Sequence, residues 1–448
     1  MRRLFGTDGI RGVAGKSPLD RITVTAIGVA LAHHLKSENP RIILGMDTRE
    51  SGSSIAAAIS GGLRQSGTRV ESAGVITTPA IAYLTTAHGF DAGIVISASH
   101  NPWQDNGIKV FGPDGYKLPD ATELAIENEI FRLLGDMNSE MLDDPISTPV
   151  ETSSYRNEYV QALLKHVEGL SLDDKRIVID CANGAASFVA PQLFEGLQGE
   201  VRIHNASPDG RNINENCGAL HPEGVAKMVV EEKGDLGITF DGDADRALFA
   251  DEHGNVINGD AIMLLAARDL KEQGKLNGDI VVATTMSNMG LEAALKNSGI
   301  RMLRANVGDK YVLEMMQKNS ASLGGEQSGH ILFGGRSTTG DGLLTALLVL
   351  DIMHRTGKSL AELTQDLKVY PQVIVNVKVR VKTPLNTIPS VAGKIAEAEK
   401  ELADTGRVVI RYSGTEALAR VMIEAEDEEQ MQRHADAIAD AIRAELGV

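Results

Sequence analysis

For most of its length the chain alternates short apolar runs with longer amphipathic segments. Apolar runs bounded by turn residues are typical of buried strands, and hydrophobic positions spaced three to four apart are typical of helices. The alternation predicts α/β units with largely parallel sheets. The predicted strands cover residues 41–46, 94–97, 176–180, 236–240 and 279–283; the predicted helices cover residues 51–66 (with hydroxyl caps at its start), 122–134, 290–297 and 341–354; a hairpin turn is predicted at residues 112–115.

The pattern changes after residue 371. Residues 373–382 alternate strictly between apolar and polar positions, as a strand with one exposed face does. Two further strands flank residues 411–416, and an amphipathic acidic helix closes the chain, so the last part is predicted to be a small α+β domain. A polar, proline-bearing segment at residues 136–149 is the first candidate linker. We therefore predict four domains, at residues 1–150, 151–255, 256–370 and 371–448.

Length and charge narrow the class of protein. A chain of 448 residues is too long for a single core. Its formal net charge of −17 argues against nucleic acid or an anionic membrane surface as a partner. No apolar run reaches membrane-spanning length, and the first residues lack the apolar region of a signal peptide. The two cysteines, Cys181 and Cys217, have no metal-binding spacing and fit reduced thiols, so we expect a cytoplasmic protein.

Three aspartates at alternate positions follow the predicted strand 236–240. Asp241, Asp243 and Asp245 on one tight loop can direct hard oxygen ligands at one point, which suits Mg²⁺ or Ca²⁺. Arg246 follows, and an arginine beside a divalent cation suits a phosphoryl group. The alternatives are a solvated turn, an EF-hand, and a phosphatase loop in which Asp241 is the nucleophile. The EF-hand is disfavoured because Arg246 occupies the position that needs glycine for the sharp turn.

A second polar loop follows the predicted strand at residues 94–97. The sequence Asn-Pro at 101–102 marks a turn and excludes a helix just before it, so Ser99 lies on a sharp loop where a nucleophile is often found. No G-x-S-x-G surrounds Ser99, and His100 as its neighbour in sequence is no evidence for a Ser–His pair. An ordinary polar loop is the alternative. Together with the aspartate loop, a hydroxyl that carries phosphate beside a bound cation is the better interpretation.

Four polar motifs occur along the chain: Ser-Ala-Ser-His-Asn-Pro at 97–102, Asp-Gly-Asp-Ala-Asp-Arg at 241–246, Gly-Glu-Gln-Ser-Gly-His at 325–330, and Arg-Tyr-Ser-Gly-Thr-Glu at 411–416. In this order and spacing they resemble the motifs of the α-D-phosphohexomutases, and the resemblance covers essentially the whole chain. It implies three α/β domains with mixed sheets and a smaller C-terminal α+β domain around a central active-site cleft. Residues 5–12 and 212–218, with Gln327, are similar to the branch that acts on glucosamine phosphate. The family often has glycine where this chain has Ala244.

The resemblance implies a role for each motif. Ser99 would carry a phosphoryl group, and one Mg²⁺ per subunit would be bound by Ser99 with Asp241, Asp243 and Asp245. Arg246 would steady the phosphoryl group, and Arg11 and Lys109 would serve phosphoryl contact and proton transfer. For Lys109, a solvated strand lysine is the alternative. The sugar would be bound by Glu326, Ser328 and His330, with His330 also acting as an acid or base. The phosphate that is not reacting would be held by five residues of the last domain: Arg411, Ser413, Gly414, Thr415 and Arg420.

The reaction implied by the resemblance is an isomerisation. Glucosamine 6-phosphate and glucosamine 1-phosphate would interconvert through phosphoserine and a 1,6-bisphosphate that turns over within the site, in the part of amino sugar metabolism that leads to UDP-N-acetylglucosamine. A hexose 1,6-bisphosphate would be the activator, and a hexosamine phosphate would be the small-molecule partner. The oligomeric state is left open, with a homodimer as one alternative. The alternatives are a phosphoglucomutase or phosphomannomutase of the same family, an Asp-nucleophile phosphatase, and a non-catalytic protein that binds Ca²⁺ or a sugar phosphate.

Overall fold

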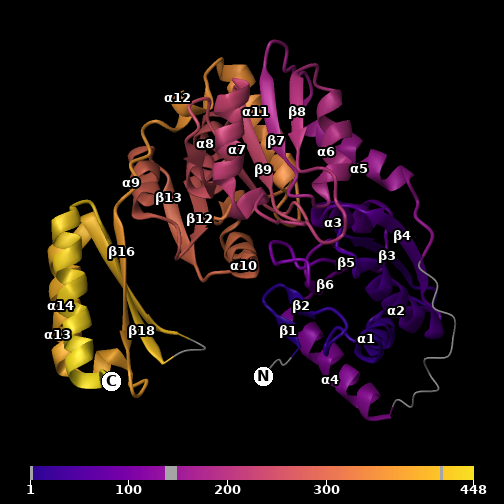
Figure 1. The fold of residues 1–448 in the computed structure, drawn as a ribbon, viewed down its shortest axis with the longest axis horizontal. Helices are drawn as coiled ribbons and strands as arrows, with labels where there is room; N and C mark the ends of the chain where they lie inside the picture. The colour runs from indigo at the N-terminus through magenta and orange to yellow at the C-terminus, as the bar shows by residue number, and fades with distance from the viewer. Residues whose placement is uncertain (1–3, 137–148, 414–416) are drawn as a thin grey trace. The chain divides into compact units, whose positions relative to one another are not determined.

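The computed structural model describes residues 4–136, 149–413 and 417–448, which form two compact units (Figure 1). The first unit comprises Met1–Met286 and Ile300–Gln365, and the second comprises Ser287–Gly299 and Asp366–Val448. Within the described residues, no helix is both long and apolar enough to span a bilayer. Cys181 and Cys217 are both buried and free, in keeping with the expected thiols.

The first sheet of unit 1 has six strands and is mixed. Its elements are β1 (Phe5–Gly6), β2 (Gly9–Val13), α1 (Arg21–His34), β3 (Arg41–Met46), α2 (Gly52–Gln65), β4 (Arg69–Val75), α3 (Thr78–Ala87), β5 (Ala92–Ile96), β6 (Asp105–Phe111) and α4 (Asp120–Asp136). The strand order is β1-β2-β6-β5-β3-β4. Strands β4, β3 and β5 are parallel, whereas β6 joins β5 and β2 antiparallel. Both faces of β3 are buried, which explains its continuous apolar sequence.

The second sheet has five strands in the order β11-β10-β9-β7-β8. Its elements are α5 (Ser154–Leu164), β7 (Arg176–Asp180), α6 (Ala186–Glu195), β8 (Glu200–His204), α7 (Pro222–Glu232), β9 (Leu236–Phe240), β10 (Ala247–Ala250) and β11 (Val256–Ile257). Strands β8, β7 and β9 are parallel, and β10 turns back antiparallel to β9. Val225 and Val229 of α7 pack against Val178 of β7 and Ala250 of β10 in one apolar cluster.

The third sheet has four strands in the order β13-β12-β14-β15. Its elements in unit 1 are α8 (Gly259–Glu272), β12 (Ile280–Thr284), β13 (Arg301–Ala305), α10 (Asp309–Asn319), β14 (Leu323–Gly325), β15 (Ile331–Phe333), α11 (Gly342–Thr356) and α12 (Leu360–Thr364). Strands β13, β12 and β14 are parallel, and β15 returns antiparallel to β14. Helix α11 is buried over most of its length, as its apolar sequence predicts.

Unit 2 is built on a three-stranded antiparallel sheet in the order β16-β18-β17. Its elements are α9 (Met289–Asn297), β16 (Gln372–Lys378), α13 (Pro389–Leu402), β17 (Gly406–Tyr412), β18 (Leu418–Ala425) and α14 (Glu428–Leu446). One face of the sheet packs its valines and isoleucines into a core that also contains residues of α13 and α14. The alternating pattern of residues 373–382 therefore predicts this half-buried strand correctly, although β16 ends at Lys378.

The first three motifs lie on connections between two antiparallel strands, and the described residues of the fourth, 411–413, lie at the end of β17, which pairs antiparallel with β18. The three connections join β5 to β6, β9 to β10, and β14 to β15. In each of the three α/β sheets, the first of the two strands belongs to the parallel part. The sheets are therefore mixed, as the family resemblance implies, and the alternation of helices and strands did not reveal this recurring hairpin.

The start of α2 differs from the sequence-based expectation. The helix is present, but the side chain of its N-cap residue Ser51 makes no capping hydrogen bond, and Ser51 has a helical backbone. Instead its hydroxyl accepts a hydrogen bond from Nδ2 of Asn106 on β6, at 2.9 Å. The predicted hydroxyl cap is thus wrong because a tertiary contact uses the oxygen. The hairpin at residues 112–115 is present, closed by the hydrogen bond from Gly112 N–H to Tyr116 O at 2.8 Å.

Candidate active site

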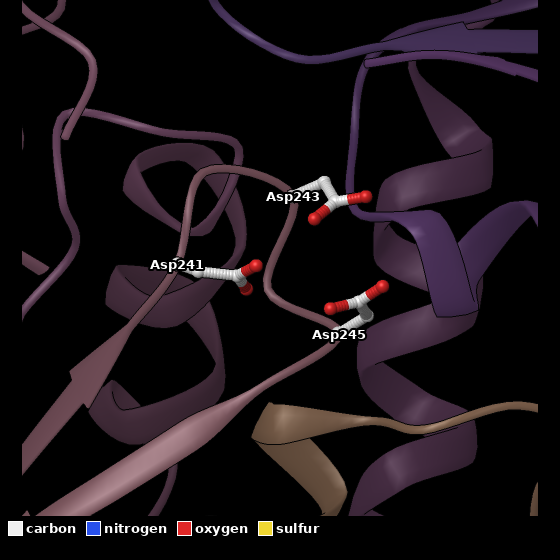
Figure 2. A group of neighbouring side chains, drawn as sticks. All are labelled: Asp241, Asp243 and Asp245. Atoms are coloured by element: carbon white, nitrogen blue, oxygen red, sulfur yellow. The ribbon is translucent and has the colours of Figure 1, made fainter. Parts of the chain in front are cut away.

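The aspartate loop between β9 and β10 forms a buried carboxylate cluster. Asp241, Asp243 and Asp245 are at most 4% exposed, and one carboxylate oxygen from each lies within 4.8 Å of the others. Figure 2 shows the three carboxylates turned toward a common space inside the loop. Burial and the two neighbouring carboxylates raise the pKa of Asp241 well above its usual value. Such crowding of like charges calls for a cation.

Lys109 supplies part of that positive charge. Its side chain, on β6, is 1% exposed, and its Nζ donates to Asp243 Oδ2 at 2.8 Å and to Asp245 Oδ2 at 3.1 Å. Burial lowers the pKa of Lys109, but the facing aspartates raise it more, so the net pKa is well above the usual value and the amine is charged. The alternative of a solvated strand lysine is therefore wrong.

The second oxygens of the same two carboxylates are left for another ligand. Asp243 Oδ1 and Asp245 Oδ1 are buried and have no hydrogen-bond partner within the described part of the chain. His330 Nδ1 lies 3.6 Å and Arg246 Nε 3.8 Å from Asp245 Oδ1, beyond hydrogen-bond distance. Buried carboxylate oxygens without a donor are costly. Two of them in an all-oxygen cluster fit a hard divalent cation such as Mg²⁺.

The hydroxyl of Ser99 reaches this cluster from the loop between β5 and β6. Ser99 Oγ donates to Asp241 Oδ2 at 2.5 Å, and His100 Nδ1 lies 3.3 Å from Ser99 Oγ. Burial, together with the positive charges of Arg246 and Arg11, lowers the pKa of His100 to about 4, so its ring is neutral at pH 7. A hydroxyl, a carboxylate cluster and a neutral imidazole are thus brought together from two distant segments.

His330 lies on the other side of Asp245, at the end of the loop between β14 and β15. Its side chain is 3% exposed. Gly340 N–H donates to Nε2 at 3.2 Å, which requires a lone pair there and places the ring proton on Nδ1, toward Asp245. Burial lowers the pKa of His330, but Asp245 and then Asp309 raise it more, and the net pKa is above the usual value.

A pocket of about 420 Å³ adjoins these groups. This volume falls within the range of about 300–1,000 Å³ that is usual for small-molecule sites. Side chains that can carry charge line the pocket, among them Arg11, His100, Arg246, Glu326 and His330. The remaining lining residues are Leu4, Gly6, Thr7, Asp8, Gly9, Asp245, Val307, Gly308 and Asp309.

The polar groups of the pocket are oriented by neighbours. Arg11 Nη1 donates to Ala98 O at 3.1 Å and to Asn101 Oδ1 at 3.0 Å, so Arg11 is tied to the Ser99 loop. Glu326 Oε1 accepts from Gly308 N–H at 3.0 Å, and Ser328 Oγ lies 3.4 Å from its other oxygen. The motifs at 97–102, 241–246 and 325–330 therefore meet at one pocket, with Arg11 and Lys109 beside them.

Three charged residues of this site were missed in the sequence. Asp8 Oδ2 lies 3.1 Å from Lys109 Nζ, and Lys117 bridges Asp8 and Asp309, with 2.5 Å between Lys117 Nζ and Asp309 Oδ2. Burial raises the pKa of Asp8, but Lys109 and Lys117 lower it to well below the usual value. Asp8 lies within residues 5–12, which resemble the family, so this similarity could have indicated it. Nothing in the sequence indicates Lys117 or Asp309.

The fourth motif lies in unit 2. Arg411 of β17 and Arg420 of β18 are register partners, and Asn376 of β16 is the next partner across the sheet. Directly opposed residues project from the same face of a sheet, so two like charges stand side by side there. Ser413 is buried and its carbonyl accepts from Lys382 Nζ at 2.6 Å. Gly414 and Thr415, also expected to bind phosphate, lie outside the described residues.

Family models match along nearly the whole chain. They describe the phosphoglucomutase/phosphomannomutase alpha/beta/alpha domains I, II and III and the C-terminal domain, and they match residues 2–134, 157–254, 258–370 and 374–441. The chain is thus similar to this family in all four of its domains, and the four-domain α/β fold with a smaller last domain is confirmed.

Curated relatives and solved structures extend the similarity over full lengths. The chain is 58% identical to a phosphoglucosamine mutase of Koribacter versatilis, with 100% of this chain and 98% of the relative covered. It is 47% identical to a phosphoglucosamine mutase of Geotalea daltonii, covering 100% and 99%. A phosphoglucomutase/phosphomannomutase family protein of Burkholderia thailandensis matches with a TM-score of 0.81 at 23% identity, covering 100% of each chain. An N-acetylphosphoglucosamine mutase of Aspergillus fumigatus, solved with GlcNAc-6P and magnesium, matches with a TM-score of 0.65 at 20% identity, covering 99% and 96%.

Proposed function

Because the chain belongs to the phosphoglucomutase/phosphomannomutase family and is therefore an isomerase of the mutase type, we propose that it interconverts glucosamine 6-phosphate and glucosamine 1-phosphate. The full-length relatives named phosphoglucosamine mutase support this choice of sugar. The reaction runs through a phosphoserine at Ser99 and a sugar 1,6-bisphosphate.

The contact between Ser99 Oγ and Asp241 Oδ2, at 2.5 Å, carries the proposal. It places the hydroxyl against the carboxylate cluster, where a phosphoryl group on Oγ would meet both a metal site and the cations of the pocket. A phosphoserine adds about 1.5 to 2 negative charges, which this surrounding of Arg11 and Arg246 can balance. Phosphoryl transfer is catalysed mainly by positioning and charge stabilisation, and both are available here.

The aspartate loop would hold the metal through the oxygens that Lys109 leaves unused. Asp243 and Asp245 each accept from Lys109 through one oxygen, and their Oδ1 atoms have no donor among the residues that the structure describes. Asp241 and the phosphoryl oxygens on Ser99 complete the ligand set. When bound, Mg²⁺ neutralises charge that develops on the transferred phosphoryl group. The complex of magnesium with the Aspergillus fumigatus mutase supports this choice of metal.

The proton balance assigns a role to His330. The free hydroxyl of the sugar forms a bond to phosphorus while the bond between phosphorus and Ser99 Oγ breaks, so one proton must leave the sugar oxygen and one must reach Ser99 Oγ. His330 lines the pocket and has its lone pair on Nε2, so this atom accepts the proton once Gly340 N–H is displaced. Ser99 Oγ takes up the second proton from solvent and donates again to Asp241.

Glu326 supplies the preference for an amino sugar. Its carboxylate lines the pocket beside Ser328 and can accept a hydrogen bond from a hydroxyl or an amino group, and a protonated 2-amino group adds the attraction between its positive charge and the carboxylate. Arg411 and Arg420 hold the phosphate that is not reacting, since the anion offsets their mutual repulsion across β17 and β18. A hexose 1,6-bisphosphate primes Ser99, and reorientation of the bisphosphate within the site completes the isomerisation.

The test is product analysis with glucosamine 6-phosphate, Mg²⁺ and a trace of hexose 1,6-bisphosphate. Wild-type enzyme should form glucosamine 1-phosphate and carry one phosphate by intact mass, whereas a folded Ser99→Ala variant should do neither. Relative kcat/KM values on glucosamine, glucose and mannose phosphates separate this enzyme from other members of the family. Equal or higher kcat/KM with glucose 1-phosphate would refute the assigned sugar, and near-normal turnover by Ser99→Ala would refute the phosphoserine.

A further inference from the structure

Ser99 has a backbone conformation that its residue type disfavours. Its φ is +53°, in the left-handed region that is unfavourable for residues with a Cβ. Nothing in the residue itself compensates for this, since serine lacks the tolerance of glycine or asparagine. The conformation must therefore be held by contacts from the surrounding structure.

Two side chains capture the carbonyl of Ser99. Arg49 Nη2 donates to Ser99 O at 2.8 Å, and Asn214 Nδ2 donates to the same oxygen at 2.9 Å. The same two groups also reach Asn101 O, at 2.8 Å and 3.3 Å. Arg49 is fully buried and paired with Asp47 at 2.9 Å, so one half of this clamp is anchored in the first α/β sheet.

Asn214 anchors the other half in the second α/β sheet. Its N–H donates to Ala182 O at 2.9 Å, and Gly218, later in the same segment, donates its N–H to Asp180 Oδ2 at 2.8 Å. Asn214 is 7% exposed and does not line the 420 Å³ pocket. Its own φ is +58°, a conformation that asparagine accepts more readily than other residues. The side chain is thus presented from a fixed backbone.

The aspartate loop closes over the same carbonyl. A Cβ built on Gly242 would lie 2.5 Å from Ser99 O and 3.1 Å from Asn214 Nδ2. Real Cβ atoms do not approach a backbone oxygen so closely, so this position admits only glycine. The Ser99 carbonyl, the Asn214 amide and the backbone of the metal loop therefore pack as one unit, and Ser99 Oγ is directed at Asp241 on the far side of the same residue.

We propose that Asn214 is a positioning residue for phosphoryl transfer: by holding the Ser99 carbonyl with Arg49, it fixes Ser99 Oγ on the aspartate loop. The inference rests on the proposed role of Ser99. Asn214 touches neither the pocket nor a metal-ligand carboxylate, so its loss should slow transfer and leave substrate binding intact. Small displacements of a reacting group can cost about 100-fold in rate, and one lost hydrogen bond about 10-fold.

The test measures Ser99 phosphorylation by glucose 1,6-bisphosphate in single turnover, followed by intact mass and by the fluorescence of Trp103, the single tryptophan of the chain. Asn214→Ala should lower this rate and kcat by about 10- to 100-fold with KM within about twofold of wild type. Asn214→Asp keeps the shape but replaces the donors by acceptors, and it should be at least as slow. Asn216→Ala is the matched control, because Asn216 has φ +54° and is exposed.

The outcomes separate the two ideas. If wild-type Ser99 takes up no phosphate, the proposed function fails. If wild type is phosphorylated and both Asn214 variants match its rate, the positioning role alone is overturned. Asn214 variants that bind substrate more weakly at unchanged kcat would also overturn it, because they would assign Asn214 to substrate contact. If both Asn214 variants fail to fold while Asn216→Ala folds, the positioning role is likewise overturned, because Asn214 would then serve the stability of the second sheet.

Discussion

Replacing Lys109 by methionine should destabilise the protein strongly in the absence of Mg²⁺. Lys109 is 1% exposed and lies 2.8, 3.1 and 3.1 Å from Asp243, Asp245 and Asp8. Methionine keeps most of the volume and removes the charge, which takes away the ammonium that Asp243 and Asp245 share. Breaking a buried ion pair in this way costs about 3–5 kcal/mol.

The magnitude has an independent upper bound. A stranded carboxylate can take up a proton instead of remaining charged, and at pH 7 this costs about 4 kcal/mol for a group with an ordinary pKa of about 3.9. Both estimates therefore give about 4 kcal/mol. Proton uptake also predicts the sign of the pH dependence: in the variant, the folded-state pKa of that carboxyl is raised, so stability relative to wild type should recover as pH falls from 7 toward 4.

The assay is urea unfolding followed by Trp103 fluorescence, at pH 5 and pH 7, with and without Mg²⁺. Because a divalent cation serves the same carboxylates, Mg²⁺ at 100 times its dissociation constant should restore about 2.7 kcal/mol. Lys175→Met is the control: Lys175 is 53% exposed and 3.4 Å from Asp235, and its loss should cost less than about 1 kcal/mol. A loss below about 1 kcal/mol for Lys109→Met, independent of pH, would refute the role of Lys109 in holding the carboxylates.

Three further predictions concern single positions. Burial raises the pKa of Asp341 to about 6 against an ordinary 3.8, so this group should remove about 2 kcal/mol of wild-type stability as pH rises from 4 to 7. Asp341→Asn should abolish this contribution, and a melting-temperature difference between the two proteins that stays constant with pH would contradict it. Arg411→Ala should raise KM about 10- to 100-fold, with Arg411→Lys only partly restored because lysine lacks the bidentate fork; unchanged kinetics would exclude phosphate contact. Ala244 has φ +55°, so Ala244→Gly should relieve about 1 kcal/mol of backbone strain and lose about 0.8 kcal/mol of methyl burial, which leaves the free energy of unfolding nearly unchanged. A loss of Mg²⁺-dependent activity in this variant would show that the methyl group matters to ligation.

Local patterns predicted much of the fold because the strands are short and apolar. The strands at 41–46, 176–180 and 236–240 have the bounds expected, since each is buried and ends at a polar loop. The antiparallel return after each motif was not predictable, because pairing direction depends on which strand comes back to the sheet edge. The Ser51 cap failed for a similar reason: Asn106, far along the chain, competes for the hydroxyl.

The candidate site divides in the same way. The aspartates and Ser99 stand out because their loops concentrate polar residues after apolar strands. Lys109 resembles an exposed lysine in the sequence. Its burial against Asp243 and Asp245, which come from a distant segment, is seen only in the structure. The Lys117–Asp309 contact joins residues 192 positions apart, so no local pattern could indicate it.

Transfer of phosphate from Ser99 to the sugar is the central claim, and a labelled single turnover tests it most directly. Enzyme carrying radiolabelled phosphate on Ser99 would be mixed with unlabelled glucosamine 6-phosphate and Mg²⁺ and quenched over time. The label should leave the protein and appear first in glucosamine 1,6-bisphosphate and then in glucosamine phosphate. Label that remains on the protein while product forms, or that appears as inorganic phosphate, would contradict the account.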